Sequence, residues 1–167
     1  MRDLLIRVAQ AGLVQARWTD QILDETFRNL TSNRPDLDPI KLGRTRELMN
    51  RAIRDVLITG YEPLIDVLDL PDPDDRHVLA AAIKGNAQLI VTENTKDFPE
   101  DKLSAWNVAA QTADEFVLDL IDLNRQAVYA QVQRMADSFQ NPPSTLDDVL
   151  NSLEQVGVLG SVAALPA

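Results

Sequence analysis

Residues 70–99 read LPDPDDRHVLAAAIKGNAQLIVTENTKDFP. This stretch predicts a helix with Asp72 as its N-cap, Pro73 at its first position and Gly85 at its end. A continuous apolar strand follows at Gln88–Thr92, which is typical of a parallel sheet covered on both faces. Carboxylates therefore stand at the start of the helix and again just past the end of the strand.

The two groups of acids are expected on one edge of the sheet. Asp74 and Asp75 open the helix, Asp97 follows the strand, and the helix runs antiparallel to the strand. Ligands of a parallel sheet bind beyond the carboxyl ends of its strands. Carboxylates crowded there repel one another unless a cation lies between them, and hard oxygen ligands suit Mg²⁺ or Mn²⁺. We therefore interpret Asp75 and Asp97 as metal ligands.

Each polar residue of this stretch also has an ordinary structural explanation. Asp72 is interpreted as a helix cap only, and Asp74 either interacts with the helix dipole or joins the metal site. His77, the only histidine of the chain, is expected to be packed or solvated rather than catalytic. Thr92 and Asn94, after the strand, either orient carboxylates and water in a second shell or serve only the loop.

The rest of the chain alternates helices with short apolar segments, which indicates an α/β domain with a mostly parallel sheet. We expect this domain over residues 1–111 and a helical C-terminal extension, packed on it, over residues 112–167. Short strands are expected at 56–59 and 108–110. Helices are predicted at 2–11, after the N-cap Thr19, from Asp38 and Pro39, from Thr112, over 124–140, and after the N-cap Thr145 with Asp148 three residues on.

Composition narrows the class of protein. The 167 residues fit one domain of ordinary size, and the 45% of apolar residues allow a sizeable core. The absence of cysteine excludes disulfides and thiolate metal sites. The apolar runs are too short to cross a membrane, so we expect a cytoplasmic protein with no membrane partner. The net charge of −10 argues against a protein that coats nucleic acid by bulk charge.

One segment is nevertheless locally basic. Residues 41–54 hold five basic residues and one acidic residue, Glu47, which gives a local charge of +4. Such a helix face can contact phosphates, and it can equally be an ordinary solvated surface. The candidates for nucleic-acid contact are Lys41, Arg44, Arg46 and Arg51, with Arg54 at the end of the segment.

The motifs DPDDRHVLAAAI and LIVTENTKDFP resemble the C-terminal half of a PIN-domain nuclease, and most of all the bacterial toxins of VapBC-type toxin–antitoxin pairs. The resemblance continues through RWTDQILDETFRNL, RPDLDP and TGYEPLIDVLDL upstream, and through DEFVLDLIDL and NPPSTLDDVL downstream. It implies a three-layer α/β domain with a central, mostly parallel sheet, and Mg²⁺- or Mn²⁺-dependent hydrolysis of RNA. It also implies a cognate antitoxin as partner and is compatible with a homodimer.

The resemblance assigns site residues by their positions in these motifs. Glu25 matches the helix acid of ILDETF, with Asp24 as the competing choice. Asp75 matches the acid that opens the DDRHVLAAA helix, with Asp74 beside it as a further metal ligand. Asp97 matches the acid of a T-x-N-x-x-D pattern, whose threonine and asparagine would support it. The implied catalytic set is therefore Glu25, Asp75 and Asp97.

The N-terminus departs from the family pattern. PIN domains open with an apolar strand that ends in an aspartate, whereas this chain opens with the helical pattern of residues 2–11. A native start further upstream, a truncated sheet completed in a dimer, and a degenerate PIN domain are each compatible with this departure. The last alternative is an inactive protein-interaction module, in which the acidic helices over 113–154 would form the surface that contacts a partner. An aspartate-based phosphotransfer domain fits less well, because no acid directly follows an N-terminal strand.

Overall fold

The computed structural model describes residues 1–140 and 142–165. The chain forms two compact units, which we describe separately. The helical unit comprises Met1–Gln15, Val91–Thr95 and Gln111–Ala167, and the central unit comprises Ala16–Ile90 and Lys96–Ala110. In this division by contacts the N-terminal segment groups with the C-terminal helices, and the boundary expected between residues 111 and 112 stays a prediction.

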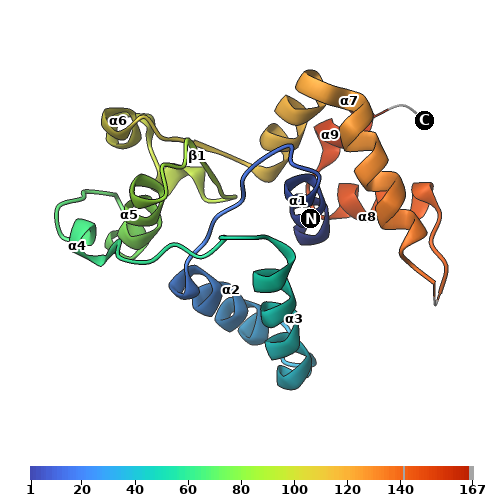
Figure 1. Ribbon diagram of the computed structural model, residues 1–167, viewed down its shortest axis with the longest axis horizontal. Helices are drawn as coiled ribbons and strands as arrows, with labels where there is room; N and C mark the ends of the chain where they lie inside the picture. Colours follow the sequence, from blue (N-terminus) through green and yellow to red (C-terminus); the bar gives the residue numbers. More distant parts are fainter. Residues whose placement is uncertain (141, 166–167) are drawn as a thin grey trace. The chain divides into compact units, whose positions relative to one another are not determined.

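The helical unit is held together by one apolar core. Its helices are α1 (Arg2–Gln10), α7 (Ala113–Asp137), α8 (Leu146–Gln155) and α9 (Leu159–Ala164) (Figure 1). Leu4 and Val8 of α1 are fully buried in the same cluster as Val117 and Val132 of α7 and Leu153 of α8. Burial of such side chains stabilises the fold by about 1.5–3 kcal/mol each, so this shared core explains why α1 belongs with the C-terminal helices.

Capping residues set the helix starts of this unit as the sequence predicted. The Thr112 hydroxyl accepts a hydrogen bond from the Glu115 N–H, and the Glu115 carboxylate accepts one from the Thr112 N–H. Thr145 opens α8 with an equivalent pair of hydrogen bonds. A kink divides α7 at Asn124, whose side chain accepts a hydrogen bond from the Ala127 N–H. The prediction that a new helix starts near residue 124 is confirmed by this kink.

The central unit carries shorter elements. They are α2 (Asp20–Asn33), α3 (Pro39–Ala52), α4 (Glu62–Ile65), α5 (Arg76–Lys84), α6 (Glu100–Leu103) and the 3₁₀ turns Pro73–Asp75 and Ser104–Trp106. Thr19 and Asp38 cap α2 and α3, as predicted, by accepting hydrogen bonds from the N–H groups of Ile22 and Ile40. The apolar cluster of this unit is built around buried side chains of Leu68, Leu79, Ile90, Phe98 and Leu103.

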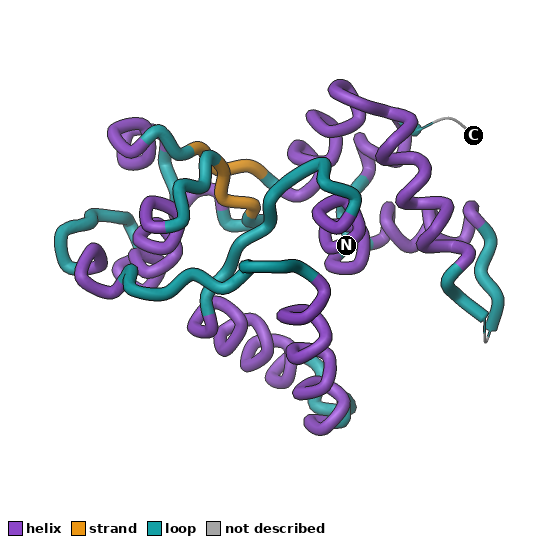
Figure 2. The backbone as a smooth tube through the Cα atoms, viewed as in Figure 1, coloured by secondary structure: helices purple, strands orange, loops and turns teal. Residues whose placement is uncertain are grey.

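The sheet is smaller than predicted. Within the described residues it pairs β1 (Leu89–Val91) with β2 (Ala109–Gln111), and Figure 2 shows these strands in orange among helices and loops. The Ala109 N–H donates to the Gln88 carbonyl and the Thr92 N–H donates to the Gln111 carbonyl, so the two strands are parallel.

The strand expected at 56–59 is reduced to a parallel bridge between Leu57 and Trp18. The left-handed backbone of Asp55 (φ +53°) and Gly60 (φ +72°) encloses this extended segment and keeps it short. The described residues therefore form a mostly helical α/β chain, and the expected central, mostly parallel sheet is represented in them by two parallel strands.

A helix that crosses a bilayer needs about 20 consecutive, mostly apolar residues. Across the described residues, none of the helices combines the length and the hydropathy of a membrane span.

Candidate metal centre

A 3₁₀ turn ahead of α5 positions two of the acids. Asp72 precedes this turn, and its carboxylate accepts a hydrogen bond from the Asp74 N–H at 2.9 Å. Asp75 ends the turn and stands directly before α5. Asp72 and Asp75 thus stand at the two ends of the turn, and their carboxylates come together, whereas Asp74 is not part of this group.

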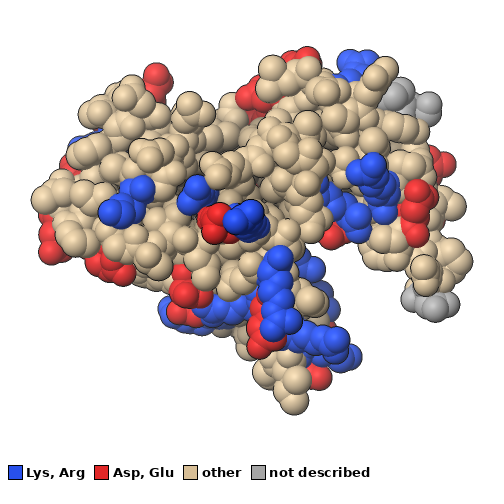
Figure 3. Space-filling model, viewed as in Figure 1, with Lys and Arg blue, Asp and Glu red and all other residues tan. Residues whose placement is uncertain are grey.

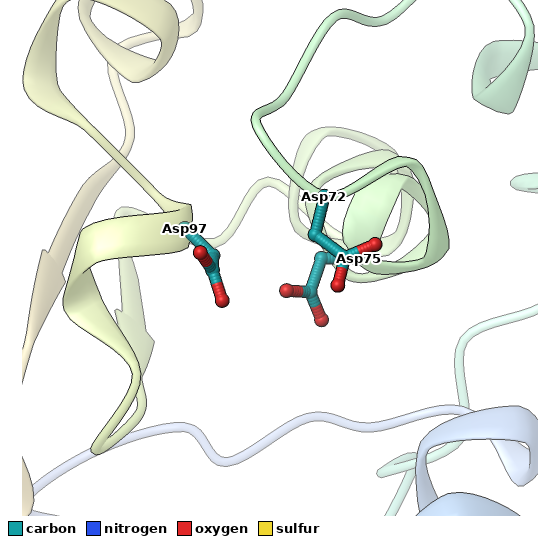
Figure 4. A group of neighbouring side chains, drawn as sticks. All are labelled: Asp72, Asp75 and Asp97. Atoms are coloured by element: carbon teal, nitrogen blue, oxygen red, sulfur yellow. The ribbon is translucent and has the colours of Figure 1, made fainter.

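Asp97 lies close to Asp72 and Asp75 but comes from the segment that follows β1. It ends a short 3₁₀ turn, Thr95–Asp97, that follows β1. Carboxylate oxygens of Asp72, Asp75 and Asp97 all lie within 4.8 Å of one another. Figure 4 shows the Asp97 side chain facing those of Asp72 and Asp75 across a short gap. We call these three residues the acidic triad.

The electrostatics of the acidic triad favour a cation. Partial burial, then the negative charges of Asp72, Asp97 and Glu25, raise the pKa of the Asp75 carboxyl above its ordinary value, while His77 acts in the opposite direction. A divalent cation would remove this repulsion. The donor set consists of oxygen atoms, at separations that one ion can bridge, and oxygen donors of this kind suit Mg²⁺ or Mn²⁺.

Glu25 lies next to the acidic triad through its contact with His77. A carboxylate oxygen of Glu25, on α2, is 3.0 Å from Nε2 of His77, on α5. His77 is 2% exposed, so the expectation that it is packed or solvated is resolved in favour of packing. The neighbouring helix acid, Asp24, instead pairs with Arg46 of α3. The structure therefore directs Glu25, and not Asp24, toward the end of α5 that carries the acids.

The acids predicted from the sequence are brought together with one exchange. Asp75 and Asp97 meet as expected, but the third member of the triad is Asp72, which the sequence had suggested only as a cap. Asp74 lies outside the triad. The i, i+3 spacing of Asp72 and Asp75 across a 3₁₀ turn is the signal that could have identified this pair.

Thr92 and Asn94 belong to the segment that groups with the helical unit. The Thr92 hydroxyl accepts a hydrogen bond from the Asn94 N–H at 3.1 Å, which closes the loop after β1. This local hydrogen bond is the contact that supports the loop interpretation. A second-shell role for the two residues stays a prediction.

The basic helix of the sequence analysis is α3. Figure 3 shows Lys and Arg side chains gathered over the part of the surface formed by α2 and α3. Lys41, Arg44 and Arg51 are exposed, as a phosphate contact requires. Arg46 differs, because its guanidinium pairs with Asp24 and, at 2.9 Å, with Asp20; these pairings raise the pKa of Arg46 and hold α3 against α2. Part of the predicted cationic surface is thus committed to joining two helices.

Comparison with known proteins places the chain in a family. A sequence model of the PIN domain matches residues 2–96, and a model of the VapC50 C-terminal domain matches residues 113–167. A curated protein of Mycobacterium tuberculosis (strain ATCC 25618 / H37Rv), named "Putative ribonuclease VapC50", is 42% identical over 98 residues, or 58% of this chain and 57% of that protein. The chain thus spans little more than half the length of that relative.

No solved structure was found to be significantly similar to the chain. The VapC50 C-terminal domain model begins at residue 113, where α7 starts, and residues 97–112 lie between the two matches. The motifs from RWTDQILDETFRNL to DPDDRHVLAAAI fall within the part that the PIN model matches, as do Asp72 and Asp75. Asp97 lies one residue past its end, and the motifs DEFVLDLIDL and NPPSTLDDVL fall within the part that the VapC50 C-terminal domain model matches. Since that model covers more than half of the sequence, the chain belongs to the PIN domain family.

Proposed function

We propose that this chain is a metal-dependent endoribonuclease, the toxin of a VapBC-type toxin–antitoxin pair. The single observation that carries the proposal is the acidic triad, with carboxylate oxygens within 4.8 Å of one another at the end of β1 and the start of α5. Membership of the PIN family and the name of the related protein support a nuclease over other uses of such acids.

The acids have distinct tasks in this proposal. Asp75, Asp97 and Asp72 would hold Mg²⁺ or Mn²⁺, and Glu25 would add a fourth carboxylate from α2. When bound, the ion would activate a water nucleophile and offset negative charge at the scissile phosphate. Asp74 supports the site only through its backbone N–H, which bonds the Asp72 carboxylate. Thr92 and Asn94 act in the second shell.

RNA and protein partners follow from the same proposal. Lys41, Arg44 and Arg51 of α3 contact the RNA backbone, while Arg46 keeps α3 in place. A cognate antitoxin and a second copy of the chain are the expected protein partners. The complete three-layer domain with a larger central sheet also belongs to this proposal.

The second candidate function is a catalytically inactive PIN domain that acts as an interaction module. The small sheet of the described residues favours it. A functional metal site would stabilise the fold by mass action, by about 2.7 kcal/mol at an ion concentration one hundred times Kd. An inactive module without a working metal site would show no thermal shift in millimolar Mg²⁺ or Mn²⁺.

The test is cleavage of a structured RNA by this chain with Mg²⁺ or Mn²⁺, beside the variants Asp97→Asn and Asp101→Asn. Asp97→Asn removes one charge from the acidic triad, whereas Asp101 lies in the first turn of α6 and outside the triad. We expect metal-dependent cleavage that only Asp97→Asn abolishes. Absence of cleavage together with absence of a metal-induced thermal shift would overturn the nuclease proposal in favour of the interaction module.

A further inference from the structure

His77 is a buried polar side chain that the proposed chemistry does not use. Its side chain is 2% exposed on α5, two positions after Asp75. The ring is packed within the central unit, where burial of a polar group is unfavourable unless the group forms a hydrogen bond. Nε2 forms such a hydrogen bond with the Glu25 carboxylate at 3.0 Å.

The two ring nitrogens define how this hydrogen bond is made. Nδ1 is buried and has no hydrogen-bond partner among the described residues. A lone pair on Nε2 would face the carboxylate lone pairs, and an Nδ1–H would be buried without an acceptor. A proton on Nε2 avoids the first cost and supplies the donor for the Glu25 carboxylate. Nε2–H therefore donates to Glu25, and the ring is fixed by the surrounding core.

Glu25 needs such an anchor because it is otherwise a mobile surface side chain. Its side chain is 37% exposed on α2, and an exposed glutamate normally samples several rotamers. Glu25 nevertheless lies close enough to Asp75 for its charge to act on that carboxyl. The anchor and the acid thus come from α5 and α2, two helices that are 52 residues apart at this contact.

We infer that His77 is a positioning residue: its Nε2–H holds the Glu25 carboxylate beside the acidic triad, so that Glu25 serves as the fourth metal-binding acid. This inference rests on the proposed function. An orienting hydrogen bond to a metal-binding group typically changes metal affinity by about 10- to 100-fold when it is removed. His77 itself touches neither the metal nor the substrate in this arrangement.

The chain offers a matched set of variants. His77→Leu removes the donor without leaving a polar group buried, whereas His77→Gln places an amide N–H near the position of Nε2. Tyr61→Phe is the control, because the Tyr61 hydroxyl donates to Gln21 of α2 at 3.1 Å, one turn before Glu25. This variant also removes a hydrogen bond that anchors α2, but from a residue that carries no charge.

The measurement is the affinity of the full chain for Mn²⁺, by electron paramagnetic resonance of free Mn²⁺, with circular dichroism to show that each variant is folded. We expect His77→Leu to weaken Mn²⁺ binding about 10-fold and His77→Gln to restore most of it. Tyr61→Phe should bind as the natural chain does. Glu25→Gln combined with His77→Leu should bind no more weakly than Glu25→Gln alone, because the histidine acts through the glutamate.

Two different failures can be told apart. Mn²⁺ binding that is equal in the natural chain and in His77→Leu overturns the positioning role and leaves the nuclease proposal intact. Additive losses in the double variant, or a loss in Tyr61→Phe as large as in His77→Leu, also overturn it, because they indicate a general effect on α2. A natural chain that binds no Mn²⁺ overturns the proposed function and the inference with it. If His77→Leu does not fold, His77→Asn, whose amide is too short to reach Glu25, takes its place in the same comparisons.

Discussion

Asp75 and Asp114 are both acids at the start of a helix, and they meet opposite surroundings. Asp114, in the helical unit, accepts hydrogen bonds from the N–H groups of Gly160 (2.9 Å) and Ser161 (2.8 Å) and from the Ser161 hydroxyl (2.6 Å). Burial acts to raise the pKa of Asp114, but these hydrogen bonds outweigh it and the pKa is lowered. Asp75, in the central unit, lies among other carboxylates and its pKa is raised.

The difference separates a carboxylate with a structural task from one that is prepared for a cation. Asp114 joins α7 to α9, and its charge is stabilised by donors of the chain itself. Gly160 permits this close approach, since a Cβ there would lie 3.1 Å from Oδ2 of Asp114 and 2.9 Å from Cδ1 of Leu118. The charge of Asp75 is destabilised by the neighbouring carboxylates, so a bound cation would stabilise the charged form of Asp75.

The largest expected effect comes from neutralising each acid in turn. Asp75→Asn should lower Mn²⁺-dependent RNA cleavage by at least about 100-fold, because it removes a metal ligand. The metal-free variant should be at least as stable as the natural chain, since its neutral amide escapes the repulsion. Asp114→Asn should keep the metal-dependent activity and lose stability. Cleavage assays and metal-free thermal unfolding measure both effects.

The contrast fails if the two variants behave alike. A folded Asp114→Asn protein that no longer responds to Mn²⁺ would show that the helical unit takes part in the metal site. An Asp75→Asn protein that unfolds more easily without metal would show that Asp75 is a structural acid after all.

The second test asks which acid completes the triad. Asn caps a helix about as well as Asp, so Asp72→Asn keeps the cap and removes the charge. We expect this variant to bind Mn²⁺ about 10-fold more weakly, and Asp74→Asn to bind it nearly normally. Mn²⁺ titration of the two variants side by side provides the measurement. The reverse order would restore Asp74 to the place that the sequence suggested for it.

A smaller effect is expected where Asp114 meets α9. Ser161 is 1% exposed, and Ser161→Ala removes the hydrogen bonds of its hydroxyl, so this variant should lower the free energy of unfolding by about 1 kcal/mol. The control is Ser152→Ala, whose exposed hydroxyl only bonds the Asp148 carbonyl of its own helix. Urea denaturation should show a lower midpoint for the first variant alone. Equal midpoints in both variants would show that the hydrogen bonds between Ser161 and Asp114 do not stabilise the fold.

Local chemistry explains which parts of this molecule could be predicted from the sequence. The caps at Thr19, Asp38, Thr112 and Thr145 were predicted because each depends on residues two or three positions away. The short helices α4, α6 and α9 were missed, since four to six residues carry too little periodicity. The grouping of α1 with the C-terminal helices depends on long-range packing, which local patterns do not record.

The candidate site divides in the same way. Asp75 and Asp97 were expected together because a strand and its preceding helix bring their ends to one edge. Asp72 was underestimated because its role as a cap already explained it, and the structure shows that the capping carboxylate also lies beside Asp75 and Asp97. The pairing of His77 with Glu25 could not be predicted from spacing, since it joins two helices whose contact depends on the whole central unit.

The smallest expected effect is on the pH dependence of metal-free stability, and it distinguishes the two acids by sign. The pKa of Asp114 is lowered in the folded chain, so its stabilisation is present above the ordinary Asp pKa of about 3.9 and is lost as pH falls through the folded value. The pKa of Asp75 is raised, so its destabilisation of the fold is present at neutral pH and disappears as pH falls through the folded value.

At pH 7 the unfolding temperature of the natural chain should therefore be higher than that of Asp114→Asn and lower than that of Asp75→Asn. Both differences should shrink on acidification, that of Asp75→Asn first, because the higher folded pKa is reached first. Thermal unfolding of the three metal-free proteins between about pH 7 and pH 3 measures this order. If the Asp114 difference closed first, the two carboxylates would have exchanged the environments described here, and the division between a structural and a cation-binding acid would not hold.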